Sequence, residues 1–272
     1  MIKLLLVFLI FSVLFVSNSF AEQEIWGIYG DSQAREKTHK KILDGLVSKN
    51  PQMIFHVGDM VQRGRDLEEW HAFRDTVDAV VKTTPFYPAL GNHDENNQFY
   101  YDYFDLPNNE QWYEVESNLA TAIVLDSNAS LLSGSEQYDW LVSALKKASG
   151  NDKWLFVFFH HPPYTIVGNH EDEKKMRREI IPLFEQYGVH MVFAGHAHTY
   201  ERTQVKEVTY IVTGGGGGPL HEKLRSNPDS KFVKIKHHYC MLSFSASSLK
   251  LDVFDTKGRE IESFEREKAY LA

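Results

Sequence analysis

The chain has 272 residues, of which 43% are hydrophobic and 24% are charged, and its formal net charge is −8. These values are typical of a globular protein with a substantial core, arranged as one large domain or two small ones. The acidic balance argues against nucleic acid or an anionic membrane as the main partner. The single cysteine, Cys240, excludes an internal disulfide, so any metal site must use oxygen and nitrogen ligands.

The N-terminal segment, residues 1–21, has the pattern of a secretory signal peptide. Lys3 precedes an apolar block over residues 4–16, and the small residue Ala21 ends the segment. A transmembrane anchor is the alternative, but the block is shorter than the ~20 residues that cross a bilayer, and no basic stop-transfer cluster follows. We therefore expect cleavage after Ala21, one mature domain over residues 22–272 without a membrane segment, and a secreted or periplasmic location.

Apolar runs of strand length alternate with segments of helical periodicity along most of the chain, which predicts an α/β core. After Gly218 the strand-like stretches 238–247 and 249–255 occur without helices and predict a terminal antiparallel hairpin. The expected strands cover residues 25–30, 53–58, 85–90, 121–126, 154–159, 189–195 and 209–214, and the expected helices cover residues 35–50, 66–81, 135–148 and 171–187.

Five of the expected strands end in polar clusters of Asp, Asn and His. In α/β sheets ligands bind at the carboxyl ends of strands, where loops converge, so five such ends can share one point in space. Taken singly, an Asp after a strand is usually a turn or a helix cap, and a lone His is usually structural. Their occurrence together predicts a functional site. The side chains are Asp31 in GDSQ, Asp59 in GDMVQRG, Asn92 and His93 in GNHD, His160 in HHPPY, and His196 and His198 in GHAHTYER.

Two carboxylates, one amide oxygen and three imidazoles form a ligand set suited to Fe, Mn, Zn or Mg and poorly suited to soft metals. A carboxylate that bridges two ions would hold them about 3.5 to 4 Å apart, the separation used for in-line attack. Two divalent ions less two carboxylates leave a local charge of about +2, which attracts phosphate even to an acidic protein. The glycine run at 214–218 lacks the GK[ST] of a nucleotide loop, and fits a close approach of backbone to the site or loop flexibility.

The ordered set GD, GD, GNHD, H and GHxH resembles the motifs of the calcineurin-like metallophosphoesterases. The VxxH spacing from Val157 to His160, the GHxHxYER run over 195–202 and TGGGGGP at 213–219 are most similar to the purple acid phosphatase branch. The resemblance spans residues 24–219. It implies an α/β fold that is a four-layer αββα sandwich of two mixed β-sheets, with a dinuclear metal site at the edge of the sheets.

The resemblance also implies a role for each matching residue. Asp59 would bridge two metal ions, and His93 would lie beyond them as a proton donor or transition-state stabiliser, with Asp94 orienting its ring. His170 lies where related enzymes have a substrate-contacting histidine, although a surface residue at a helix start is the alternative. The implied ligands of the first ion are Asp31 and His198, and those of the second are Asn92, His160 and His196.

The sequence departs from the family pattern at two positions. Gln33 stands where many members have a histidine, two residues after the first Asp. Gln62 stands where the purple acid phosphatases have a metal-binding tyrosine, three residues after the second Asp. Neither strong ligand is present, so we expect the first metal to bind loosely, to be replaceable, or to use the side-chain carbonyl of Gln33. The choice among Fe, Mn and Zn for the two ions stays open.

These features predict an exported dinuclear metal-dependent phosphoesterase that hydrolyses phosphate monoesters of small molecules. The expected reaction is attack of a metal-bound hydroxide on phosphorus, with both ions stabilising charge on the phosphoryl oxygens. One alternative is a phosphodiesterase or nucleotidase with the same metals, because the pocket walls decide that preference. Another is a non-catalytic module that binds metal or ligand, which the intact His93 argues against.

Overall fold

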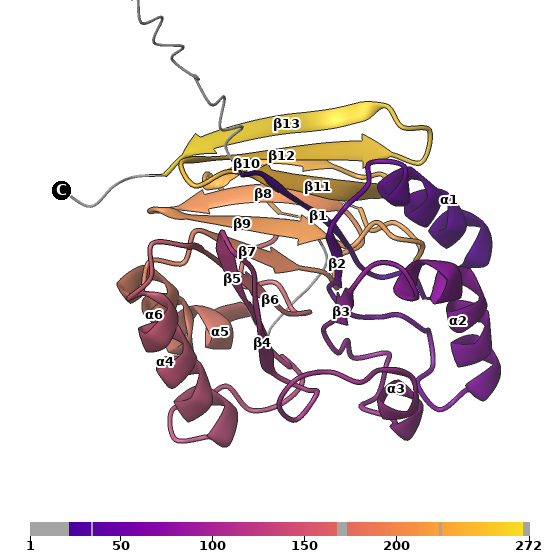
Figure 1. Ribbon diagram of the computed structural model, residues 1–272, viewed down its shortest axis with the longest axis horizontal. Helices are drawn as coiled ribbons and strands as arrows, with labels where there is room; N and C mark the ends of the chain where they lie inside the picture. The colour runs from indigo at the N-terminus through magenta and orange to yellow at the C-terminus, as the bar shows by residue number, and fades with distance from the viewer. Residues whose placement is uncertain (1–21, 34, 168–172, 223–224, 269–272) are drawn as a thin grey trace, which may run out of the picture.

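Two β-sheets packed face to face form the centre of the molecule (Figure 1). The computed structural model describes residues 22–33, 35–167, 173–222 and 225–268. The six-stranded sheet has the order β13-β12-β11-β1-β2-β3, in which β1, β2 and β3 run parallel and the others are antiparallel to their neighbours. Its strands are β1 (Glu24–Tyr29), β2 (Met53–His56), β3 (Phe86–Pro88), β11 (His238–Phe244), β12 (Ser248–Asp255) and β13 (Glu260–Glu267).

The seven-stranded sheet has the order β10-β8-β9-β7-β6-β5-β4. Strands β5, β6, β7 and β9 run parallel, whereas β4, β8 and β10 pair in antiparallel fashion. Both sheets are therefore mixed, as predicted. The strands are β4 (Tyr113–Glu116), β5 (Ala120–Val124), β6 (Trp154–Phe158), β7 (Met191–Ala194), β8 (Tyr200–Val205), β9 (Val208–Thr213) and β10 (Ser230–Lys234).

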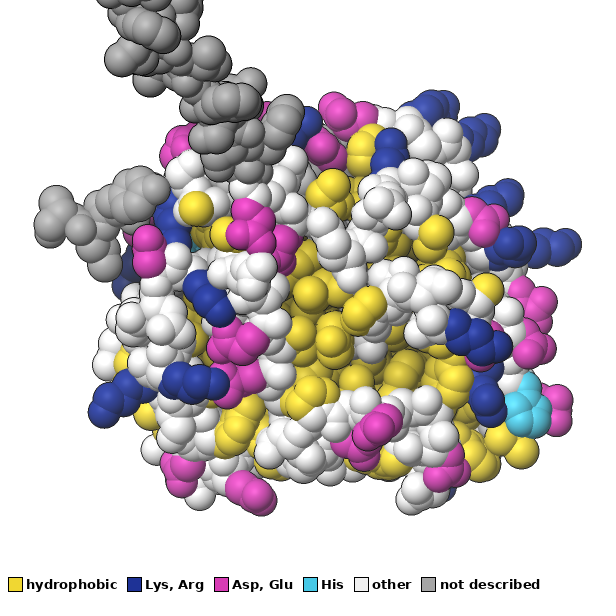
Figure 2. Space-filling view, in the orientation of Figure 1, with side chains coloured by type: hydrophobic (Ala, Val, Ile, Leu, Met, Phe, Trp, Pro, Cys, Tyr) yellow, Lys and Arg dark blue, Asp and Glu magenta, His cyan; other side chains and the backbone are white. Residues whose placement is uncertain are grey.

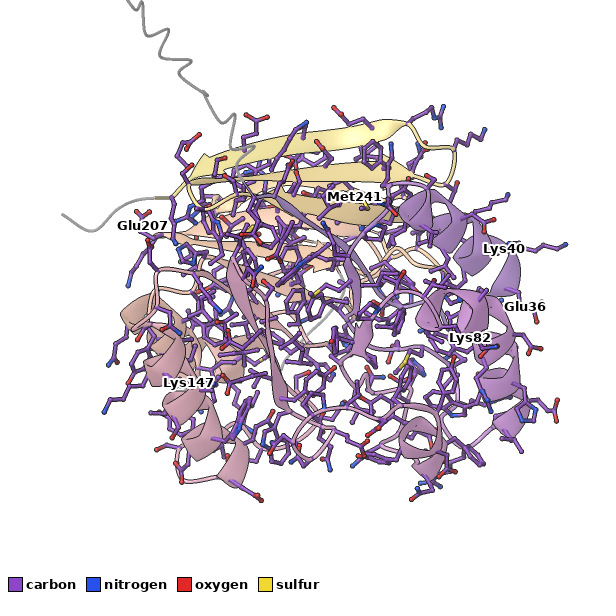
Figure 3. All side chains as sticks on the ribbon, in the orientation of Figure 1. Glu36, Lys40, Lys82, Lys147, Glu207 and Met241 are labelled. Carbon is purple, nitrogen blue, oxygen red and sulfur yellow. The ribbon has the colours of Figure 1, made fainter. Side chains whose placement is uncertain are left out.

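Helices cover the outer faces of both sheets, which confirms the four-layer αββα sandwich. In Figure 1, α1 and α2 lie on one side of the sheets and α4 and α6 lie on the other. Figure 3 shows Lys40 on α1 pointing away from the sheets. Lys147 on α4 pairs with Glu114 of the edge strand β4 at 3.0 Å. Side chains on the inner faces of these two helices, such as Ile42 and Leu141, are buried. The helices are α1 (Glu36–Val47), α2 (Leu67–Val81), α3 (Gln98–Tyr103), α4 (Glu136–Ala148), α5 (Glu173–Glu179) and α6 (Ile181–Gln186).

The core between the sheets is largely aromatic. The ring of Phe55 on β2 stacks on that of Phe158 on β6, with centroids 4.1 Å apart and planes 8° apart. The alternation of side chains along β6 places Phe158 in this core and Val157 in the second core beneath α4 and α6. Figure 2 shows hydrophobic side chains gathered at the middle of one face, with charged side chains around them.

Two features of the secondary structure differ from expectation. The helix expected over 171–187 is divided into α5 and α6, because Pro182 has no N–H to donate to the carbonyl of Arg178 and therefore begins a new helix. Five elements were not expected: the short elements α3, β4, β8 and β10, and the long strand β13. Among the described residues, no helix is both long enough and apolar enough to cross a membrane. The expected signal segment 1–21 lies outside the described residues.

Candidate metal centre

The predicted ligands follow the ends of parallel strands in both sheets. Asp31, Asp59 and Asn92 follow β1, β2 and β3 of the six-stranded sheet. His160 and His196 follow β6 and β7 of the seven-stranded sheet. Because the carboxyl ends of these strands meet at one edge of the sandwich, side chains from sequence positions more than a hundred residues apart come together there.

The ligand atoms of these side chains lie within a few ångströms of one another. His198 Nε2 lies 3.3 Å from Asp31 Oδ1, and His160 Nε2 lies 3.3 Å from Asp59 Oδ1. His160 Nε2 also lies 3.0 Å from Asn92 Oδ1, and 3.2 Å from Nδ1 of His196. Asp59 therefore belongs to the first of two groups that could each hold a metal ion, and it contacts His160 of the second. These groups are Asp31, Asp59 and His198, and His160, His161 and His196, with ligand atoms within 4.8 Å of one another in each.

The backbone at three of these ligands is in the left-handed region. The φ angles are 60° at Asp31, 57° at Asp59 and 65° at His196. Such conformations cost about 1 to 3 kcal/mol each in residues other than glycine and cluster at functional sites. Here they are held by hydrogen bonds: Asp31 N–H donates to the Gly58 carbonyl at 2.9 Å, and His196 N–H donates to Asp31 Oδ1 at 3.0 Å.

Glycines allow the backbone to approach these ligands closely. A Cβ atom at Gly91 would lie 2.2 Å from both the backbone N and Oδ1 of Asp59, and one at Gly195 would lie 2.4 Å from Asp31 Oδ2. The glycine run does the same, because a Cβ at Gly218 would lie 2.6 Å from Cε1 of His198. The backbone approach expected for residues 214–218 is therefore confirmed.

Hydrogen bonds to the backbone orient two imidazoles toward the carboxylates. His160 Nδ1 lies 2.8 Å from the Val57 carbonyl oxygen, and His198 Nδ1 lies 2.6 Å from that of Pro219. Each Nδ1–H donates there, so Nε2 is the ring atom that faces the carboxylates and can hold either a proton or a metal ion. Within the described part of the chain, Gln33 Oε1 is buried without a hydrogen-bond partner, although its amide Nε2 lies 3.3 Å from His198 Nε2. Ligand atoms converging in this way fit bound cations, and the donor set fits hard or borderline divalent ions.

The electrostatics of the centre favour positive charge. Burial disfavours the charged form of His160, but the carboxylates of Asp59 and Asp31 raise its pKa to about 10. Burial also opposes ionisation of Asp59, yet His160 and His93 together lower the pKa of Asp59 below its ordinary value. Asp31 raises the pKa of His198 against the effect of burial. The two buried carboxylates thus create a negative electrostatic potential, which a bound cation would neutralise.

His93 lies at the rim of the centre, and its ring is held by Gln62. Nδ1 of His93 lies 2.8 Å from the backbone oxygen of Gln62 and 2.9 Å from its side-chain Nε2. Nε2 lies 4.0 Å from Asp59 Oδ2, and the side chain is 35% exposed. Glu69 on α2 accepts the N–H of Gln62 at 2.7 Å. This hydrogen bond positions Gln62, which in turn positions the His93 ring.

Asp94 does not orient His93, and that expectation is wrong. Its side chain is fully buried, and its two oxygens accept hydrogen bonds from four backbone N–H groups. Burial and the neighbouring Asp59 carboxylate raise the pKa of Asp94 to about 7, while these hydrogen bonds oppose the rise. Asp94 therefore joins the loop after β2 to the loop after β3. The donors are Asp59 at 2.9 Å, Met60 at 2.9 Å, Val61 at 3.3 Å and Gly91 at 2.8 Å.

Two histidines near the centre were not singled out from the sequence. The His161 ring lies 4.5 Å from the His196 ring, centroid to centroid, and belongs to the second group of ligand atoms. The His221 ring stacks on the His198 ring, with centroids 4.1 Å apart. The doubled histidine of HHPPY could have indicated His161, but nothing local marks His221. His170, expected to contact substrate, lies outside the described residues.

The end of the GHAHTYER run has a structural role. Tyr200 OH donates to Glu262 Oε2 at 2.6 Å, and Arg202 forms an ion pair of 2.7 Å with Glu262 Oε1. The buried Glu201 accepts the N–H of Ile166 at 2.9 Å. These contacts attach β8 to β13 of the other sheet and to the segment after HHPPY, so they support the centre without entering it.

The four-layer sandwich and the two ligand groups in contact through Asp59 are the features of a metallophosphoesterase. A family model described as calcineurin-like phosphoesterase matches residues 27–200, and the chain belongs to this family. Membership implies a dinuclear metal site, which the donor set described above fits.

Comparisons place the chain near the purple acid phosphatases. It is 28% identical over 224 residues to a purple acid phosphatase of Glycine max, covering 73% of this chain and 48% of that protein. It is 25% identical over 308 residues to the probable inactive purple acid phosphatase 1 of Arabidopsis thaliana, covering 95% and 50%. The structure of purple acid phosphatase PPD1 from yellow lupin, Lupinus luteus, matches with a TM-score of 0.83 at 21% identity, covering 92% and 55%, which shows the shared fold. The chain spans about half the length of the curated relatives it matches.

Proposed function

We propose that this protein is an exported dinuclear metal-dependent phosphoesterase that hydrolyses phosphate monoesters of small molecules. The observation that carries the proposal is that Asp59 belongs to one group of ligand atoms and contacts His160 of the other, on the fold of a phosphoesterase family. Asp59 would contact both ions, and the Gln33 side-chain oxygen would complete the ligand set of the first ion. Asp31 and His198 would hold the first ion, and Asn92, His160 and His196 would hold the second.

The ligand types favour Fe, Mn or Zn as the two ions. When bound, the ions would supply Lewis acidity at the phosphoryl oxygens and activate the attacking water. Their charge would exceed that of Asp31 and Asp59, so the edge of the sandwich would attract the substrate phosphate although the chain as a whole carries a net charge of −8.

His93 is the residue we assign to proton donation. When its ring carries two protons, Nδ1–H donates to the Gln62 carbonyl, and Nε2–H remains directed toward the centre near Asp59 Oδ2. Partial exposure of the ring leaves room for a substrate beside it. A proton on Nε2 could then pass to the leaving oxygen as its bond to phosphorus breaks.

Metal reconstitution with two chromogenic substrates tests this function. Protein depleted of metal and reloaded with Zn²⁺, Mn²⁺ or iron should hydrolyse p-nitrophenyl phosphate, and should do so faster than bis(p-nitrophenyl) phosphate. The chelator-treated protein is the control. Faster turnover of the bis ester would identify a phosphodiesterase instead. Two bound ions with no turnover of either ester would identify a non-catalytic metal-binding module.

Export is part of the proposal and has its own measurement. If residues 1–21 are a signal peptide, protein recovered outside the cytoplasm should begin at Glu22. Intact-mass spectrometry of cell fractions checks this. A mass that includes Met1 in the exported fraction would contradict cleavage after Ala21.

A further inference from the structure

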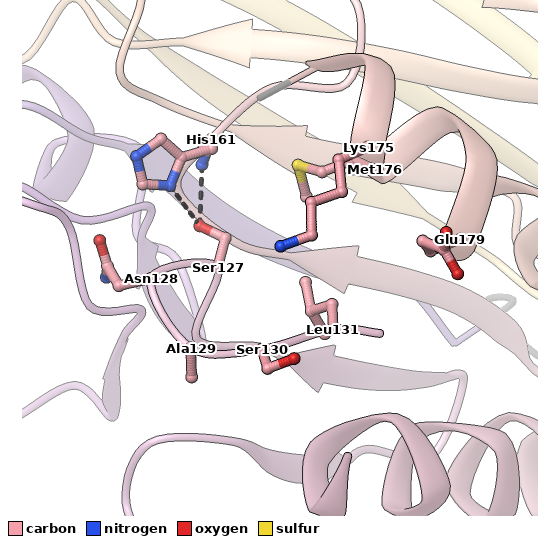
Figure 4. Close-up of a pocket in the computed structure, with 9 residues that line it drawn as sticks. All are labelled: Ser127, Asn128, Ala129, Ser130, Leu131, His161, Lys175, Met176 and Glu179. Atoms are coloured by element: carbon pink, nitrogen blue, oxygen red, sulfur yellow. Dashed lines mark hydrogen bonds between the residues drawn. The ribbon is translucent and has the colours of Figure 1, made fainter. Parts of the chain in front are cut away.

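A pocket of about 430 Å³ lies beside the candidate metal centre, within the size range of small-molecule sites (Figure 4). Its walls come from three parts of the chain: the loop over residues 127–131 after β5, His161 after β6, and the α5 helix. The proposed function leaves this pocket without a role.

Two contacts connect the pocket to the ligand shell. His161 forms one wall, and its ring lies 4.5 Å from that of His196 and 5.0 Å from that of His160. The ring of His161 is fixed, because its Nδ1 lies 2.8 Å from Ser127 Oγ, which also accepts the backbone N–H of His161 at 3.0 Å. Asn128 Nδ2 donates to the carbonyl of Leu90 at 3.2 Å, which ties the pocket loop to the strand end that carries Asn92. A molecule whose phosphate binds at the second ligand group would therefore extend into this pocket.

Two charged residues, Lys175 and Glu179, line the pocket. Figure 4 shows the Lys175 ammonium directed into the space between His161 and Leu131. Lys175 forms no ion pair within the described part of the chain, whereas the other charged lining residue, Glu179, pairs with Arg178 at 2.7 Å. The remaining polar lining groups are the imidazole of His161 and short hydroxyl and amide side chains, which offer hydrogen bonds and carry no carboxylate.

We propose that this pocket receives the leaving group of the substrate, and that Lys175 selects leaving groups that carry a second anionic group. This inference rests on the proposed phosphoesterase function. It gives a role to an ammonium that has no ion-pair partner among the described residues and faces a pocket next to the proposed metal centre. On this proposal, α5 sets the preference among substrates, and the metal ligands do not contribute to it.

Equilibrium binding of substrate-like phosphonates tests the inference without turnover. The probes are alkylphosphonates of two to five carbons and the matched series that ends in a carboxylate, titrated by calorimetry into zinc-loaded protein. At least one carboxylated probe should bind the wild type about fivefold more tightly than its matched alkylphosphonate, the effect expected of one partly exposed ion pair. Lys175→Glu should remove or reverse this preference. Lys174→Glu, a change of the same charge at an exposed neighbour outside the lining, should retain it.

The possible outcomes separate the two proposals. A preference that persists in Lys175→Glu, or that is absent for every probe in the wild type, would overturn the role of Lys175. If p-nitrophenyl phosphate is turned over but no probe is preferred, the pocket inference alone fails. If the probes bind with the expected preference but no ester is hydrolysed, the phosphoesterase function fails and the pocket stands as an anion-binding site.

Discussion

The carboxylate of Asp94 accepts the backbone N–H of Asp59 at 2.9 Å, so the residue that follows His93 positions the carboxylate through which the two ligand groups are in contact. The same oxygen accepts the N–H of Gly91 at 2.8 Å. One buried side chain thereby sets the spacing of the loops after β2 and β3. The GNHD motif contains residues with different roles: Asn92 is a proposed metal ligand, His93 is the proposed proton donor, and Asp94 accepts hydrogen bonds from the backbone.

This arrangement predicts that Asp94→Ala destabilises the protein. The change would leave four buried N–H groups without their acceptor, so the free energy of unfolding should fall by about 3 kcal/mol or more. Urea denaturation of the metal-free protein measures this loss. A change below about 0.5 kcal/mol, the range of ordinary surface substitutions, would contradict the structural role.

His93→Ala should show the opposite pattern, with stability and metal content unchanged and catalysis altered. General acid catalysis typically contributes ~10² to 10⁴ in rate and matters most when the departing oxygen is basic. Alkyl phosphates should therefore lose far more rate than p-nitrophenyl phosphate. An equal loss on both substrates would point to stabilisation of phosphoryl charge, and loss of metal would make His93 a ligand. Full activity on both would leave His93 without a catalytic role.

The presence of Gln62 in place of a tyrosine allows a prediction about the colour of the iron-loaded protein. It occupies the position of the tyrosine that gives the purple relatives their visible absorption, and its side chain here contacts His93. The iron-loaded wild type should be colourless, and Gln62→Tyr should gain an absorption band that disappears on reduction. A strong tyrosinate-to-iron band in the wild type would show that another residue supplies the phenolate.

The burial of His39 leads us to expect a loss of stability in acid. Burial lowers the pKa of His39 to about 3. Its Nε2 lies 2.8 Å from Tyr29 OH, and its ring stacks on that of Phe73. The unfolded chain binds a proton below pH 6.5 that the folded protein excludes until about pH 3, so stability falls as pH falls through this window. Between pH 6.5 and 4 this one group accounts for about 3 kcal/mol.

Comparison of the wild type with His39→Gln isolates the contribution of His39 to the pH dependence of stability. Both proteins are unfolded with urea in chelator at several pH values, so that release of metal does not contribute. The variant should lose about 3 kcal/mol less than the wild type over this pH range. Parallel pH dependence of the two proteins would show that His39 takes up its proton without unfolding.

The sequence patterns were sufficient to predict an α/β core and the place of the centre, whereas the four layers of two sheets were implied by the resemblance to a known family. Apolar runs followed by Asp, Asn or His mark buried strands and their carboxyl ends, and parallel strands bring those ends to one edge. The break between α5 and α6 was also predictable, because Pro182 cannot continue a helix. Short edge strands such as β4 and β10 have too few residues for a clear hydrophobic alternation, and their pairing depends on the neighbouring strand.

The contacts within the centre depend on tertiary structure and were harder to predict. Asp94 adjoins His93 in sequence, which favoured a direct pair, yet its side chain turns to amides on another loop. The contact of His93 with Gln62 joins loops 31 residues apart and has no local signature. The same holds for His221, which reaches His198 only because the glycine run folds back on the centre.

The bridging position of Asp59 is the central claim of this account, and the metal content of Asp59→Ala tests it most directly. Wild type, Asp59→Ala, Asp31→Ala and Asp44→Ala would be loaded with Zn²⁺, desalted and measured by elemental analysis; Asp44 is an exposed carboxylate paired with Lys40 and serves as the control. We predict two ions in the wild type and in Asp44→Ala, about one in Asp31→Ala, and close to none in Asp59→Ala, because both shells lose a ligand at once. Two ions retained by Asp59→Ala would contradict the shared ligand and, with it, the dinuclear assignment.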